Sequence, residues 1–174
     1  MKKRYPRILR EIAESLIMTI GLFLFLVIFV IQGYKVYGSC MEPNLWTGER
    51  LLGNKFIYHF ENPTRGDIVV FKYPKDTKRI FIKRIIGLPG ETVEIRDHKV
   101  YVNGKSIDEH LYVKNLPHGA DFGPSTVPDD SYFVMGDNRD MSLDSRTWGF
   151  LPQKLVQAKA WLRYWPLDRT SILK

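Results

Sequence analysis

The pattern of hydrophobic and polar residues changes sharply about 30 residues into this chain. Residues 16–31 read LIMTIGLFLFLVIFVI and contain no charged side chain. As a helix, a run of this length covers about 24 Å, which is short of the hydrocarbon core of a bilayer. Extending the run from Ile12 to Tyr37 closes the gap and places Tyr34 and Tyr37 in the aromatic belt at the interface. Residues 12–37 are therefore predicted to form a transmembrane anchor.

A cleaved secretory signal is the alternative for this apolar run. Such signals have a shorter hydrophobic region, which is followed by a cleavage site with small residues. Here the run continues into Gln32, Gly33, Tyr34 and Lys35, and no small-x-small site lies nearby. The sequence therefore favours an anchor that is retained.

After residue 37 the pattern becomes that of short strands. Runs rich in β-branched and aromatic residues are bounded by Gly, Pro, Asn and Asp. They predict strands at 50–52, 68–73, 79–86, 92–96, 99–102, 131–135 and 158–163. Asn103-Gly104 predicts a hairpin turn, and the Tyr-Pro-Lys-Asp of residues 73–76 predicts another reversal. Residues 114–130 hold three prolines and two glycines and predict a long surface loop. The predicted fold is mostly β and antiparallel, preceded by a single transmembrane helix.

The charges beside the anchor predict its orientation. The amino-terminal end has a net charge of +3, from Lys2, Lys3, Arg4, Arg7 and Arg10 against Glu11 and Glu14. Positive flanks of membrane spans stay in the cytoplasm. Residues 1–11 are therefore predicted to form a cytoplasmic tail, and residues 38–174 an extracytoplasmic domain held at the cell membrane. That part is long enough for one compact domain.

Composition limits the partners that this chain could bind. The remaining excess of +4, out of a formal net charge of +7, is spread along the chain. This distribution indicates a solvated surface rather than nucleic-acid binding, with a supporting role for anionic membrane lipid. Cys40 is the one cysteine of the sequence, so no intramolecular disulfide can form.

Lys83 is a candidate general base. It lies within IFIKRII, residues 80–86, where strand alternation puts it on the same face as Phe81 and Ile85. A lysine on such a face either extends to water or loses hydration, and lost hydration favours the neutral amine that a base needs. An ordinary surface lysine at the end of a strand is the alternative.

A polar stretch after the apolar run 132–135 is the next candidate. Residues 136–149 read GDNRDMSLDSRTWG. So many turn-forming and hydrogen-bonding residues in succession can build a polar support, in which Asp144 pairs with Arg146 and hydroxyls orient their neighbours. An ordinary Asn/Asp/Gly turn is the alternative.

Four segments follow the apolar run in order: 38–45 (GSCMEPNL), 65–71 (RGDIVVF), 83–90 (KRIIGLPG) and 136–149. In order and spacing they resemble the motifs of bacterial type I signal peptidases, and the last motif is highly specific. The resemblance implies a membrane-bound endopeptidase of the Ser/Lys-dyad type, which removes signal peptides from exported preproteins after small residues. It implies signal peptides and membrane lipid as partners, and no cofactor.

The resemblance also implies catalytic roles by position. Residue 40 stands at the nucleophile, and Lys83 stands at the general base that takes its proton and later protonates the leaving amine. The backbone N–H of Cys40 is the expected oxyanion donor. Some relatives add a side-chain hydroxyl two positions earlier, where this chain has Gly38.

Supporting roles follow from the same resemblance. Ser142 matches the serine that orients the lysine amine, and Asp144 and Arg146 match a supporting salt bridge. Met41, Phe81 and Ile82 stand where the substrate-binding surface is expected.

Cys40 is the main departure from the family pattern, which has serine immediately before the methionine. Ser39 lies one residue too early to replace it, and Asn44 stands where threonine is usual. A thiol is an intrinsically good nucleophile, so a Cys/Lys dyad is chemically feasible. A stable thiolate–ammonium pair or a badly placed sulfur would instead block it. The sequence leaves three alternatives open: a natural cysteine enzyme, a nucleophile-substituted variant, and an inactive relative that binds signal peptides without cutting them.

Other functions are disfavoured. A lipoprotein precursor would modify Cys40, but Tyr37 stands where an aliphatic residue is expected and the cysteine lies beyond the apolar run. Cytoplasmic Ser/Lys repressor-type autoproteases would have no membrane anchor. A metal enzyme is disfavoured because the histidines do not have the spacing of ligands; they are His59, His98, His110 and His118.

Overall fold

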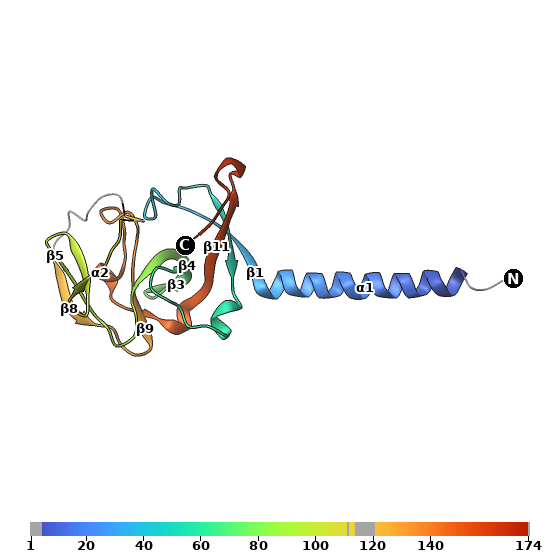
Figure 1. Cartoon of the computed structure of the whole chain (residues 1–174), viewed down its shortest axis with the longest axis horizontal. Helices are drawn as coiled ribbons and strands as arrows, with labels where there is room; N and C mark the ends of the chain where they lie inside the picture. Colours follow the sequence, from blue (N-terminus) through green and yellow to red (C-terminus); the bar gives the residue numbers. More distant parts are fainter. Residues whose placement is uncertain (1–4, 111, 114–120, 174) are drawn as a thin grey trace.

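The computed structural model describes residues 5–110, 112–113 and 121–173, which form a long helix followed by a β-rich domain (Figure 1). Helix α1, Tyr5–Val30, projects away from the domain and exposes many large apolar side chains. Within the described part of the chain, no helix meets the length and apolarity needed to cross a membrane. The predicted transmembrane helix is therefore not supported.

The helix ends before the predicted limit of the anchor at Tyr37. Strand β1, Ile31–Lys35, pairs antiparallel with β2, Arg50–Asn54. The backbone N–H of Lys55 also donates to the carbonyl of Val30 at 2.9 Å, so the pairing reaches the last helical residue. The predicted helical anchor is thus wrong over residues 31–35, because β2 satisfies their backbone groups.

Eight of the strands in the described residues form the larger sheet, in the order β1-β2-β11-β3-β4-β9-β10, with β12 beside β11. The remaining bounds are β3 Ile68–Tyr73, β4 Asp76–Gly87, β9 Ser131–Met135, β10 Leu151–Pro152, β11 Val156–Trp165 and β12 Ser171–Ile172. Neighbouring strands are antiparallel. Strand β4 lies between β3 and β9, so Lys83, which pairs with Val69 of β3, lies on an interior strand.

A smaller sheet, at the end of the domain far from α1, has the order β7-β6-β5-β8 (Figure 1). Its strands are β5 Thr92–Arg96, β6 Lys99–Val102, β7 Lys105–Ser106 and β8 Phe122–Thr126. The predicted hairpin turn at Asn103-Gly104 is confirmed: both residues have positive φ, and Val102 pairs with Lys105. Short helices complete the fold; they are α2 Ser145–Trp148, η1 Ile57–His59, η2 Gln153–Leu155 and η3 Leu167–Arg169.

The core follows from alternation along β3. Val69 and Phe71 pack on one face of the larger sheet with Trp148 of α2. Ile68 and Val70 pack on the other face, against the segment that joins β1 to β2. A third cluster fills the space where the two sheets meet, through residues such as Ile86, Val93 and Phe133. The segment between β1 and β2 is therefore fixed by burial rather than by regular structure.

Most predicted strands are confirmed. Those at 68–73, 92–96, 99–102 and 131–135 have the observed limits, and the other three lie inside longer strands. The reversal at 73–76 is confirmed too, since Tyr73 pairs with Asp76.

The long loop predicted over 114–130 is wrong at Phe122–Thr126, which forms β8 and pairs with β5. Pro124 fits there because β8 is an edge strand, where a missing N–H breaks no ladder. Residues 114–120 of the predicted loop lie outside the described residues.

Candidate active site

The turn that carries Cys40 lies between β1 and β2. Gly38 begins it with φ of 84°, a conformation that residues with a side chain rarely adopt. The N–H of Glu42 then donates to the carbonyl of Ser39 at 3.1 Å, and that of Leu45 to the carbonyl of Met41 at 2.8 Å. Met41 and Leu45 are completely buried, whereas Cys40 is partly exposed. The turn therefore points its thiol-bearing residue outward by anchoring its neighbours in the core.

Lys83 is buried on β4. Its exposed fraction is 2%, and its Nζ lies 5.7 Å from the centre of the Phe81 ring, on the face predicted by strand alternation. Among the described residues it forms no ion pair with a carboxylate. Burying an ammonium without a partner is costly, so this environment is unusual for a purely structural lysine.

Cys40 and Lys83 line the same cleft, which has a volume of about 910 Å³. The Cys40 Sγ lies 3.9 Å from the carbonyl oxygen of Ile82, the residue before Lys83. Two strands contribute to the lining of the cleft: Gln32, Tyr34 and Lys35 come from β1, and Arg79, Ile80, Phe81 and Ile82 come from β4. Met141 and Leu143 contribute from the polar stretch after β9. The structure thus brings together two residues that are far apart in the sequence.

The stretch after β9 holds the Cys40 turn in place. The backbone N–H of Asn138 donates to the carbonyl of Cys40 at 3.0 Å, and its side-chain Nδ2 donates to the carbonyl of Ser39 at 3.1 Å. Gly136 allows this close approach, because a Cβ there would lie 2.4 Å from the Cys40 carbonyl oxygen and 2.3 Å from Ser142 Oγ. Position 136 therefore has no room for a side chain.

The Ser142 hydroxyl is buried and has no hydrogen-bond partner within the described residues. A buried hydroxyl without a partner costs stability, and such a group is often retained for a function. Its contact with Gly136, beside the Cys40 carbonyl, puts this hydroxyl in the neighbourhood of the cleft.

Asp144 and Arg146 form the ion pair that the sequence predicts. Arg146 Nε lies 2.8 Å from Asp144 Oδ1, and the carboxylate is completely buried. The same carboxylate accepts from the N–H of Gly136 at 3.1 Å and caps the first turn of α2 through the N–H of Arg146. Arg146 also donates to the carbonyl of Arg139 at 2.6 Å. The pair fixes the backbone of the stretch that contacts Cys40.

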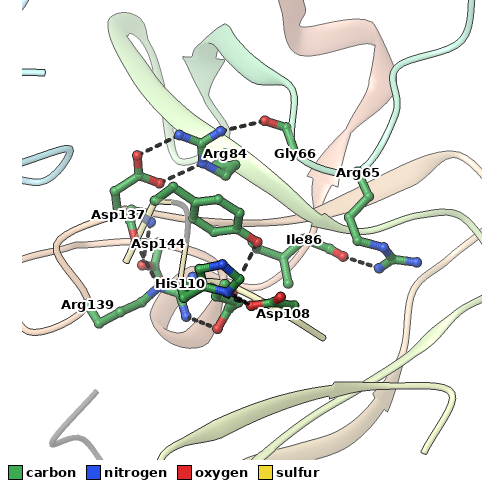
Figure 2. Close-up of polar contacts among 12 residues, drawn as sticks. Arg65, Gly66, Arg84, Ile86, Asp108, His110, Asp137, Arg139 and Asp144 are labelled. Carbon is green, nitrogen blue, oxygen red and sulfur yellow. Dashed lines mark hydrogen bonds and ion pairs between the residues drawn. The ribbon is translucent and has the colours of Figure 1, made fainter. Parts of the chain in front are cut away.

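A second buried ion pair joins Arg84 to Asp137 (Figure 2). Arg84 Nε and Nη2 each lie 2.8 Å from an oxygen of Asp137, and Nη1 donates to the carbonyl of Gly66 at 2.7 Å. Asn44 Nδ2 donates to the same carboxylate at 2.8 Å. This pair therefore links the strand of Lys83 to the turn of Cys40.

Sequence reasoning assigned no role to Arg84 or to Asp137 individually. The available signal was the sequence Lys83-Arg84 on a strand. Consecutive residues of a strand point to opposite faces, so in an interior strand both cations are buried and Arg84 needs a counter-charge. Asp137, two residues after the end of the apolar strand β9, is that partner.

Tyr112 lies over this pair, with its ring centre 4.3 Å from the Arg84 guanidinium carbon. Burial raises the pKa of the Tyr112 hydroxyl to about 12, and the nearby negative charge of Glu109 adds to the shift. Glu109 itself pairs with Arg139, at 2.8 Å between Oε2 and Nη1. Contacts thus link Arg84, Asp137, Tyr112, Glu109 and Arg139 into one polar network.

The expected substrate-binding residues divide into two groups. Phe81 and Ile82 line the cleft. Met41 has no exposed surface and packs in the core beneath the turn, so direct contact with a substrate is not available to it. In the described part of the chain, no group of three or more His, Cys, Asp and Glu residues could hold a metal ion.

The sequence matches one protein-family model over residues 9–165, described as "Signal peptidase, peptidase S26". The chain belongs to this signal peptidase family. It is 40% identical over 169 residues to "Probable signal peptidase I-2" of Synechocystis, covering 94% of this chain and 76% of that protein. It is also 40% identical over 177 residues to "Signal peptidase I P" of Bacillus subtilis subsp. natto, covering 97% and 95% of the two chains.

A solved structure of a signal peptidase I from Enterococcus faecalis V583 is also similar. The sequence identity is 40%, the TM-score is 0.49, and the match covers 57% of this chain and 97% of that chain.

Proposed function

We propose that this chain is a membrane-attached signal peptidase in which the Cys40 thiol is the nucleophile and the Lys83 amine is the general base. One observation carries the proposal: Cys40 and the buried Lys83, which has no acidic partner among the described residues, line one cleft. The match to the signal peptidase family supports the substrate class, namely signal peptides of exported preproteins.

The proposed reaction has two stages. Cys40 Sγ attacks the scissile carbonyl carbon while Lys83 Nζ accepts the thiol proton, and the Cys40 backbone N–H stabilises the oxyanion. The C–N bond then breaks, and Lys83 returns the proton to the leaving amine. Water attacks the resulting thioester, Lys83 takes the water proton, and the departing thiolate recovers it. Ser142 Oγ has no hydrogen-bond partner among the described residues, and we propose that it orients the Lys83 amine once the peptide is bound.

Helix α1 is proposed to attach the chain to the membrane, with residues 1–11 in the cytoplasm and the β domain outside. Apolar side chains along α1 are exposed, among them Ile17, Leu22 and Phe23. The segment after β2 adds two exposed aromatic residues, Phe56 (46%) and Phe60 (74%), near the end of α1. Exposed apolar surface of this kind marks a membrane or protein contact, and aromatic residues favour the membrane interface.

The catalytic assignment is tested by cleavage of a signal-peptide substrate with alanine at positions −3 and −1, using the purified full chain in detergent. Lys83→Arg is expected to abolish cleavage, because a guanidinium does not deprotonate at usable pH. Lys72→Arg is the matched control, since Lys72 is an exposed lysine on the neighbouring strand β3. If Lys83→Arg kept a tenth of the parent activity, Lys83 would not be the base.

The nucleophile is tested by Cys40→Ser and Cys40→Ala. Cys40→Ala is expected to be inactive, and Cys40→Ser at least as fast as the parent, because Met41, Pro43 and Lys83 match the serine family. Alkylation should inhibit the parent and leave the serine form active. A parent more than about tenfold faster than the serine form, 1.4 kcal/mol in barrier, would show a site adapted to cysteine.

An inactive relative that binds signal peptides without cutting them is the second candidate, and Cys40 in place of serine is the observation that favours it. It predicts that the parent binds the peptide without product, while Cys40→Ser restores cleavage. Turnover by the parent that alkylation of Cys40 abolishes would exclude this candidate.

The proposed topology is tested on spheroplasts with an impermeant thiol reagent and an external protease. The reagent is expected to label Cys40, and the protease is expected to remove the carboxy terminus. Protection of the carboxy terminus in spheroplasts with intact membranes would refute the orientation.

A further inference from the structure

The carboxy-terminal hairpin packs beside the turn that carries Cys40. It consists of the end of β11, helix η3 and β12, where Arg163 pairs with Ser171 and Leu162 with Ile172. In Figure 1 this red hairpin leaves the sheet next to the strands that flank the turn. Part of it, including Arg169, lies beyond the residues that match the family model. The reaction proposed above assigns this hairpin no role.

Two arginines of the hairpin converge on one buried carboxylate. Arg163 Nη1 lies 3.1 Å from Glu49 Oε2, and Arg169 Nη1 lies 2.8 Å from Glu49 Oε1. The Glu49 side chain is only 3% exposed. Arg163 also donates through Nε to the carbonyl of Arg169 at 2.6 Å and through Nη2 to Ser171 Oγ at 2.9 Å. The two guanidinium groups therefore have fixed orientations.

The same two arginines donate to the carbonyls at the end of the Cys40 turn. Arg163 Nη1 lies 2.7 Å from the carbonyl oxygen of Asn44, and Arg169 Nη2 lies 3.4 Å from that of Pro43. Charged donors make the stronger kind of hydrogen bond. Because Asn138 holds the carbonyls of Ser39 and Cys40, hydrogen bonds hold the turn at both ends.

We propose that Arg163 and Arg169 are positioning residues, which set the place of the Cys40 thiol through the carbonyls of Asn44 and Pro43. The inference rests on the function proposed above, in which Cys40 is the nucleophile. Neither arginine lines the cleft, so a substrate does not contact them there. A positioning defect should lower kcat and leave KM almost unchanged, because misplacement of a reacting group acts on the chemical step.

Arg169→Met is the first variant, because it keeps the Arg163–Glu49 pair and with it a partner for the buried carboxylate. We expect kcat to fall about tenfold with KM within about twofold of the parent. Arg169→Lys should recover part of the loss, since an ammonium still pairs with Glu49. Arg163→Lys is the second variant: it keeps a charge for Glu49 but loses the planar group that reaches Asn44 and Arg169 together.

Arg96→Met is the matched control. Arg169 lies over the Trp46 ring and pairs with Glu49. Arg96 likewise lies over the Tyr101 ring and pairs with Glu94, but it belongs to the smaller sheet. Its loss should leave kcat unchanged. An increase in KM without loss of kcat in Arg169→Met would overturn the proposal, as would equal losses in Arg169→Met and Arg96→Met.

Alkylation of Cys40 by iodoacetamide separates this inference from the proposed function, because no other cysteine competes. The rate is measured well below the unfolding temperature of every variant. A change of about threefold or more in Arg169→Met, reduced in Arg169→Lys and absent in Arg96→Met, supports positioning even if the parent cuts no peptide. Equal alkylation rates in all variants, with kcat unchanged where cleavage occurs, would refute it.

Discussion

Gly136→Ala is expected to damage the site through a steric conflict that the structure locates. The added Cβ would lie 2.4 Å from the Cys40 carbonyl oxygen and 2.3 Å from Ser142 Oγ, whereas ordinary contacts begin at 3.4 Å. Gly136 itself has little freedom to move, because its N–H donates to Asp144 and its carbonyl accepts from Arg139. The Cys40 turn must therefore shift.

The size of that shift sets the expected loss. Restoring an ordinary contact requires a movement of about 1 Å, and a misplacement of that size can cost about 100-fold in rate. This corresponds to about 2.7 kcal/mol in the barrier. Overpacking of this kind also destabilises a fold by about 1–3 kcal/mol, which lowers the Tm of a chain of this length by about 2–12 °C.

The assay compares Gly136→Ala with Gly33→Ala, a glycine on β1 where an added Cβ would have only the Tyr164 hydroxyl nearby, at 3.8 Å. Peptide cleavage gives kcat/KM, calorimetry gives Tm, and iodoacetamide reports on Cys40 directly. Gly33→Ala should behave as the parent. If Gly136→Ala kept kcat/KM and the alkylation rate within about threefold of the parent, the argument from close approach would be wrong.

Three further outcomes follow from the buried polar groups. Asp137→Asn should lower the free energy of unfolding in urea by about 3–5 kcal/mol, because Arg84 loses its buried counter-charge. Glu94→Gln, which breaks the exposed Arg96–Glu94 pair, should lower it by less than about 1 kcal/mol, and equal losses in the two variants would contradict the prediction. Ser142→Ala should leave Tm unchanged or slightly raised, since its hydroxyl has no partner among the described residues, while kcat falls; a clear drop in Tm would show a hydrogen bond there. The pKa of Tyr112 is raised to about 12 in the folded chain, so the unfolded chain releases this proton first and stability should fall as pH rises from about 10 to 12; Tyr112→Phe should make that fall shallower, and an unchanged slope would contradict the shift.

Strands could be predicted from the sequence where apolar residues alternate, as in β5 and β6, or form a short continuous run, as in β3 and β9. Strand β1 could not, because its first residue continues the apolar run of α1 and only its pairing with β2 identifies it as a strand. Strand β8 contains glycine and proline, so its local sequence indicates a turn although β5 pairs with it. In both cases the segment forms a strand because a distant strand pairs with it, and the local sequence does not show that pairing.

The site was predictable where a motif marks it. Cys40, Lys83 and the Asp144–Arg146 pair all lie within such segments, and the structure brings Cys40 and Lys83 to one cleft. The link from Asn44 through Asp137 to Arg84 was missed because its contacts join residues 93 and 53 positions apart. The hairpin arginines were missed for the same reason, since Arg163 and Glu49 are 114 positions apart.

The direct passage from α1 into β1 has a geometric consequence. No loop separates Val30 from Ile31, and the five residues of β1 are paired to β2 along their whole length. An extended strand of that length spans about 17 Å, so a paired strand rather than an unpaired loop follows the helix on the way to the turn that carries Cys40. In the membrane-attached form proposed above, the length of β1 therefore limits how far the Cys40 turn can lie from the end of α1.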